Sequence, residues 1–289
     1  SKTYVLTRGE HELDVAYELY SSVGGEVRIT IGERLDEGYR VLDPIVALQV
    51  KQSSLGEIRG RSGMGFRRHS TDMFDIYVGV DTAAERSIDE IAAERSQAVH
   101  EICSYLGVQP QDRITMVFYP DAETKYRDTG HTGHGWAFGT TLMEIRNDEV
   151  RVDPYHELTH ILASQIGSPP ALFNEGLATY LPELFCPTER TADERVRAMA
   201  ADLWPLEELL AFSEIGSAES RPQVAYPQAA SIVKFLINES GREKFLAAYR
   251  LMRSPTDAEM QTANLEIFRR VFGADFGDVE RRWRLHVLG

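Results

Sequence analysis

Two histidines and two glutamates in the middle of the chain have the types and spacing of a catalytic metal site. His156 and His160 flank Glu157 in the pattern His-Glu-x-x-His, and Glu175 follows 15 residues after His160. On a helix, residues four apart lie on one face, so both imidazoles can point at one ion. Glu157 would lie on the adjoining face, where it can serve as general base toward water activated by zinc. Hydrolysis is the chemistry that this pattern predicts.

The flanking residues predict that the pattern lies on a helix. Asp153 is a favourable N-cap and Pro154 a favourable first helical residue. Gly167 and the prolines after it should end the helix after about 13 residues. An apolar face beside the histidines is supplied by Leu158, Ile161, Leu162 and Ile166. The competing interpretation is a helix whose histidines only pack or face solvent.

A second predicted helix, residues 171–184, carries Glu175. Only residues 167–170 separate the two helices, so they should fold back on each other and bring Glu175 to the histidines. Two histidines and one carboxylate, with a fourth position open to water, are typical of a catalytic rather than a structural zinc site. Glu144 and Glu183 are alternative ligands, and Thr179 could hydrogen-bond a ligand or only pack.

A glycine-rich stretch before the pattern is predicted to line a substrate cleft. Residues 141–146 alternate as a strand, and a strand edge beside a cleft can pair with an extended substrate. Glycines there would let a substrate backbone approach closely. The candidate substrate-binding residues are His134, Gly135, Trp136, Ala137, Phe138 and Gly139. His131 and His134 could instead be exposed loop residues, or ligands of a second metal.

Composition bounds the class of protein and its partners. Of the 289 residues, 43% are hydrophobic and 26% charged, as in a globular protein with an ample core. The net charge of −14 argues against nucleic acid or an anionic membrane surface as the main partner. The sequence contains no apolar run of the length that a membrane-spanning helix needs, about eighteen residues.

The cysteines and the start of the chain leave localisation and oligomeric state open. Cys103 and Cys186 cannot make a disulfide scaffold or a Cys-x-x-Cys metal clip. Cys103 is predicted to be a buried helical residue, and a single bond between the two stays open. The chain begins with Ser1 and shows no signal peptide. An exported protein whose signal peptide has been removed is the expectation that we favour.

The remaining pattern predicts an α+β fold in two parts. Residues 1–70 should form a small β-rich accessory domain, with strands at 13–20, 27–31, 39–42 and 45–51 and a hairpin loop at 21–25. The Gly- and Arg-rich residues 56–69 should be a solvated loop or linker, with anion binding as the alternative. Residues 71–167 should form a sheet with strands at 73–78, 113–119 and 141–146, a helix at 82–106 and the motif helix. Residues 168–289 should be mostly helical, at 171–184, 189–203, 205–211, 226–237, 242–252 and 276–287.

With these residues in place, the chain resembles the gluzincin metallopeptidases, the relatives of thermolysin and aminopeptidase N, and in particular the peptidase MA-like group. The resemblance covers residues 71–289 and is carried by His-Glu-Leu-Thr-His at 156–160 and Phe-Asn-Glu-Gly-Leu-Ala-Thr-Tyr at 173–180. It implies a zincin-like catalytic domain, one Zn²⁺ per chain held by His156, His160 and Glu175, and Glu157 as general base. Residues 225–230 are similar to the segment with that family's transition-state tyrosine, which implies Tyr226 as an oxyanion donor; simple core packing is the alternative.

The chain also departs from aminopeptidase N. The signature Gly-x-Met-Glu-Asn, which binds a free amino terminus in that family, is absent, and Gly-Trp-Ala-Phe-Gly at 135–139 stands in its place. The spacing between His160 and Glu175 is also a few residues shorter. We therefore expect a zinc metallopeptidase acting on a peptide or protein, with endopeptidase favoured over aminopeptidase activity. The alternatives are a non-catalytic binding or scaffold protein of this fold, and a zinc hydrolase of a non-peptide amide or ester.

Overall fold

The computed structural model describes residues 25–35, 38–50, 62–186 and 188–289, and the chain divides into two compact units, Ser1–Ile58 and Arg59–Gly289. In the first unit, β1 (Gly25–Leu35) and β2 (Gly38–Val50) pair antiparallel. The strands expected at 39–42 and 45–51 are the single strand β2, which continues through Pro44. Proline is tolerated there because both strands of a two-stranded ribbon are edge strands. The strand expected at 13–20 lies outside the described residues, as do residues 21–24 of the loop expected at 21–25, whose last residue begins β1.

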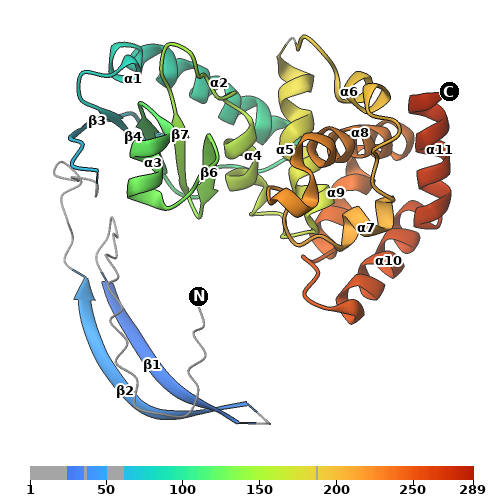
Figure 1. Ribbon diagram of the computed structural model, residues 1–289, viewed down its shortest axis with the longest axis horizontal. Helices are drawn as coiled ribbons and strands as arrows, with labels where there is room; N and C mark the ends of the chain where they lie inside the picture. The colour runs from blue at the N-terminus through green and yellow to red at the C-terminus, as the bar shows by residue number, and fades with distance from the viewer. Residues whose placement is uncertain (1–24, 36–37, 51–61, 187) are drawn as a thin grey trace. The chain divides into compact units, whose positions relative to one another are not determined.

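A mixed five-stranded sheet forms one layer of the second unit (Figure 1). Its order is β3 (Phe66–Ser70), β4 (Phe74–Gly79), β5 (Ile114–Tyr119), β7 (Thr141–Ile145) and β6 (Gly135–Phe138). The three inner strands are parallel to one another, and the two outer strands run antiparallel to their neighbours. Among the described residues no strand pairs with the outer edge of β6, so the backbone groups of this edge can pair with another extended chain.

Crossovers that contain helices join the parallel strands β4, β5 and β7, and a further helix follows the last strand of the sheet. α1 (Ala83–Arg86) and α2 (Ile88–Leu106) follow β4, α3 (Ala122–Thr129) follows β5, and α4 (His156–Ala163) follows β7. The helix expected at 82–106 is interrupted at Ser87, whose amide still bonds the carbonyl of Ala83 at 3.1 Å. α3 was not expected, since its sequence is charged with a single buried residue; Asp121 caps it by accepting from the Thr124 amide at 2.7 Å.

The rest of the second unit is helical, as the sequence predicts. The helices are α5 (Ala171–Phe185), α6 (Ala192–Ala198), α7 (Leu206–Ala211), the 3₁₀ turn η2 (Ala218–Ser220), α8 (Pro222–Ser240), α9 (Arg242–Leu251), α10 (Ala258–Phe272) and α11 (Phe276–Leu288). The sequence did not predict a helix at the position of α10. The largely apolar α8 packs against α5, α6 and α9 and forms the centre of this layer (Figure 1). Among the described residues, none of the helices combines the length and apolar character needed to cross a bilayer.

The boundary between the two parts differs from the expected one at residue 70. The second unit begins at Arg59, and β3 pairs with β4 from Phe66 opposite Gly79 to Ser70 opposite Asp75. Residues 66–69 of the Gly- and Arg-rich loop expected at 56–69 are thus part of β3. The reason is pairing and charge: Arg67 forms an ion pair with Glu85, and Arg68 lies 2.7 Å from Asp75.

Candidate metal centre

The start of α4 is set by two contacts from outside the helix. Asp153 Oδ1 accepts from the amides of Tyr155 and His156, both at 2.9 Å, so Asp153 satisfies the first amides from a position before the N-cap. The carbonyl of Pro154 accepts from the Arg95 guanidinium at 3.3 Å and stays outside the helix. The helix therefore runs over His156–Ala163 and is shorter than the 13 residues expected, while His156 and His160 still face one way.

The turn after α4 is packed against the end of α9. A Cβ at Gly167 would lie 2.8 Å from the Tyr249 carbonyl oxygen, so only glycine allows this approach. The Ser254 amide also donates to the Ser168 carbonyl at 2.9 Å. This contact fixes where α5 begins and brings Glu175, one turn into α5, against the two histidines.

Three side-chain atoms from α4 and α5 form a nearly equilateral triangle. His156 Nε2 and His160 Nε2 are 3.2 Å apart, and Glu175 Oε2 lies 3.4 Å from the first and 3.3 Å from the second. The side chains are only 17–20% exposed. In the part of the chain that the structure describes, this is the one group of three or more His, Cys, Asp or Glu that can hold a metal ion.

The triangle has the dimensions of a tetrahedral zinc site. Zinc bonds to nitrogen and oxygen of about 2.0–2.1 Å place two ligands of a tetrahedron about 3.3–3.4 Å apart. The observed edges of 3.2, 3.3 and 3.4 Å match that separation. Glu175 Oε2 is also buried and receives no hydrogen bond from the described residues, which is costly for a carboxylate unless a cation binds it. The donor set and its geometry thus fit zinc.

The charges of the cluster are strongly coupled. Burial disfavours a charged His156, but the adjacent Glu175 carboxylate outweighs that effect and raises the pKa of His156 to about 9. Burial also disfavours the Glu175 carboxylate, yet the two histidines lower the pKa of Glu175 to about 2. A proton on His156 thus balances Glu175, and a metal ion has to displace that proton to bind.

A buried hydrogen-bond chain supports His160 from behind. Its Nδ1 lies 3.4 Å from Asn174 Oδ1, and the same oxygen accepts from the Tyr249 hydroxyl at 2.7 Å. If Nε2 bound a metal ion, the imidazole would carry its proton on Nδ1 and Asn174 would be its acceptor. Neither residue is predicted from the sequence to support the cluster, and Tyr249 carries no local signal because it comes from α9, far along the chain.

Glu157 is directed at the edge strand β6. Its side chain is buried, and a Cβ placed on Gly135 would overlap Glu157 Oε1 and lie 3.0 Å from Cδ. Burial raises the pKa of the Glu157 carboxyl above its ordinary value, against the opposing effect of the two histidines. A carboxyl with a raised pKa is suited to take a proton and return it.

The other predicted site residues lie at different distances from the cluster. The Tyr226 ring lies 6.0 Å from the His156 ring between centroids, and its hydroxyl donates to the Ile215 carbonyl at 2.7 Å. The Thr179 hydroxyl is buried without a hydrogen bond to the described residues. The alternative ligands are engaged elsewhere: Glu144 bonds Arg95, and Glu183 bonds Lys234.

The predicted substrate-binding stretch forms β6 and the residues beside it. Gly135 meets Glu157, Ala137 packs on the core and Phe138 is 71% exposed. His131 accepts from Lys125 and stacks on Trp136, with ring centroids 5.2 Å apart. It is therefore no member of a metal cluster within the described residues. Cys103 is buried on α2 as predicted, and Cys103 and Cys186 are both free thiols.

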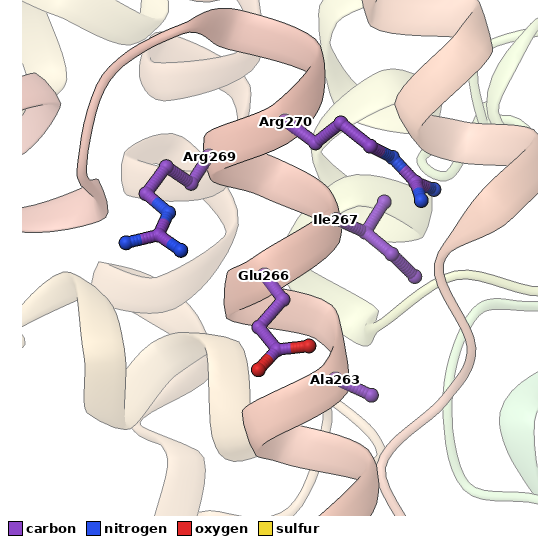
Figure 2. A pocket seen from close by; sticks show the side chains of 5 residues that line it. All are labelled: Ala263, Glu266, Ile267, Arg269 and Arg270. Atoms are coloured by element: carbon purple, nitrogen blue, oxygen red, sulfur yellow. The ribbon is translucent and has the colours of Figure 1, made fainter.

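A separate hollow of about 600 Å³ lies on α10 (Figure 2). It is lined by Ala263, Glu266, Ile267, Arg269 and Arg270, all from that one helix. Figure 2 shows the two arginines extending in different directions, so they do not converge on one point. None of these residues belongs to the metal cluster, and the hollow has no part in the chemistry of that cluster.

Comparisons with known proteins do not identify a family for this chain. No family model and no curated protein matches the chain. Among solved structures, it is similar to a mutant of an M1 zinc metallopeptidase from Deinococcus radiodurans, with 15% identity and a TM-score of 0.44. The match covers 93% of this chain and 62% of that one, so the chain spans less than two thirds of that protein's length.

Proposed function

We propose that the chain is a zinc-dependent metallopeptidase of the gluzincin type, with a zincin-like fold in its second unit. The observation that carries the proposal is the triangle of His156 Nε2, His160 Nε2 and Glu175 Oε2. Its edges of 3.2–3.4 Å suit tetrahedral zinc, and Glu175 Oε2 is buried without a hydrogen-bond donor among the described residues.

Each predicted site residue has a role in this proposal. His156, His160 and Glu175 would hold the ion through the three atoms of the triangle. When bound, zinc supplies a Lewis acid that makes water a nucleophile at neutral pH. Glu157 accepts the proton of the attacking water and passes it to the leaving amine. The Tyr226 hydroxyl, once released from the Ile215 carbonyl, donates to the oxyanion.

The free edge of β6 supports a peptide as the substrate. An extended peptide can add to this edge through backbone hydrogen bonds, with its scissile bond beside Glu157. His134, Gly135, Trp136, Ala137, Phe138 and Gly139 are the residues proposed to contact it. The segment lacks the acidic residue and asparagine that would bind a free amino terminus, so the proposal is an endopeptidase.

Metal analysis combined with a peptide-library digest tests the proposal. Purified protein should bind one zinc per chain and cleave peptides, Glu157→Gln should bind zinc without cleaving, and Glu175→Gln should lose zinc. Glu183→Gln is the matched control, because Glu183 is a similarly buried carboxylate on α5 outside the cluster, and it should keep both properties. Cleavage by Glu157→Gln at the wild-type rate would refute the mechanism. Zinc binding without cleavage by any variant would favour a scaffold or a hydrolase of another amide or ester.

A further inference from the structure

A fully buried lysine binds the loop that leads to Gly135, the residue packed against Glu157, and takes no part in the proposed chemistry. Lys125 is the single buried residue of α3, with no exposed surface. Taking an ammonium out of water is costly unless hydrogen bonds or counter-charges compensate. No carboxylate within the described residues lies at ion-pair distance from its Nζ, so Lys125 is held by neutral groups.

Both of its hydrogen-bond partners belong to the loop before β6. Nζ donates to the Gly133 carbonyl at 2.8 Å and to His131 Nδ1 at 3.1 Å. The Gly133 amide also donates to His131 Nδ1 at 3.1 Å. Because Nδ1 accepts from both, the neutral ring carries its proton on Nε2. The same ring stacks on Trp136, with an interplanar angle of 1°.

The loop ends where β6 meets the general base. The His134 carbonyl accepts from the Ile145 amide at 2.9 Å, which ties the loop to β7. The next residue, Gly135, packs against Glu157 so closely that no Cβ fits between them. Lys125 is also within electrostatic reach of this carboxylate: burial lowers the pKa of Lys125 to about 8, and the negative charges of Glu157 and Glu144 partly offset that effect.

We propose that Lys125 is a positioning residue: by holding the 130–134 loop through Gly133 and His131, it presses Gly135 against Glu157 and fixes the carboxylate for proton transfer. The proposal rests on the proposed function. A displacement of about 1 Å in a reacting group can cost on the order of a hundredfold in rate, so an anchor at Gly133, two residues before the Gly135 contact, can set turnover. The metal ligands lie on α4 and α5, outside this loop, and zinc binding should not depend on Lys125.

The test compares Lys125→Met with Lys234→Met as the matched control. Lys234 is also largely buried, with partners at 2.7 and 3.0 Å, but it joins α8 to α5 and α6 away from β6. Lys125→Met should lower kcat about tenfold or more with little change in KM and unchanged zinc affinity. Lys234→Met should keep kcat per zinc-loaded molecule. His131→Phe, which keeps a stacking ring but removes the acceptor, serves if Lys125→Met does not fold, and should lower kcat in the same way.

A second readout does not depend on activity. The three indole N–H signals of the zinc-loaded protein, with Trp136 assigned through Trp136→Phe, report the loop directly. Lys125→Met should shift the Trp136 signal, and Lys234→Met should leave it in place. An unshifted Trp136 signal, or a shifted one with unchanged kcat, would overturn the proposal while the peptidase function stands. A wild type that cleaves no peptide would refute the proposed function, and this proposal with it.

Discussion

The Tyr249 hydroxyl allows a direct test of how α9 supports the metal ligands. The hydroxyl donates a hydrogen bond of 2.7 Å to Asn174 Oδ1, and this oxygen lies 3.4 Å from His160 Nδ1. In Tyr249→Phe, Asn174 loses the bond that orients its amide, so the acceptor of His160 is free to turn away. Losing such a partner of a metal-ligating histidine typically costs about 10–100-fold in metal affinity. Because the Asn174 contact to His160 is long, we expect the lower value, about tenfold or 1.4 kcal/mol of binding free energy.

The assay is a competition for zinc against a chromophoric chelator, with both variants brought to the same fraction folded. Tyr77→Phe is the matched control, because Tyr77 is 1% exposed and its hydroxyl bonds to none of the described residues. It should bind zinc as the wild type does. At saturating zinc, Tyr249→Phe should recover most of its peptidase activity, since it changes no group proposed to touch substrate.

Two results would refute this reasoning about Tyr249. One is an unchanged zinc affinity in Tyr249→Phe, which would mean that Asn174 keeps its orientation unaided. The other is an equal loss in both tyrosine variants, which would mean that any lost buried hydroxyl weakens the site through general destabilisation.

Three further outcomes are expected. Zinc affinity should rise with pH up to about 9, because zinc must displace the proton that Glu175 holds on His156, and a zinc affinity that stays constant from pH 6 to 9 would contradict this coupling. The same raised pKa of His156 should make the metal-free protein lose stability between pH 6.5 and about 9. Gly176→Ala should lower the free energy of unfolding in urea by about 1–3 kcal/mol, since the new Cβ would lie 2.6 Å from the Ala229 carbonyl oxygen on α8. An unchanged midpoint of the urea unfolding curve would argue against this close packing. Tyr226→Phe should lower kcat about a hundredfold or more at unchanged zinc affinity, and an unchanged kcat would remove Tyr226 from the mechanism.

The spacing of residues along the chain was sufficient to predict the three candidate metal ligands. His156 and His160 share a face because they are four residues apart on a helix, and the short connection at 167–170 folds Glu175 back onto them. The fold class and most elements of the second unit followed from periodicity in the same way. The exact limits of α4 did not, because the Pro154 carbonyl is taken by Arg95, a residue of α2.

The contacts that orient the site were decided by the tertiary structure alone. Tyr249 reaches Asn174 across 75 positions of sequence, and Gly135 meets Glu157 only because β6 lies at the sheet edge beside α4. Lys125 sits in a charged helix that no apolar periodicity marks. Spacing along the chain encodes which side chains share a face of one element, whereas the distance between faces of different elements depends on how the whole core packs. The sequence by itself therefore determined which three side chains form the candidate cluster, and the packing of α3, α9 and β6 around them determined how they are held.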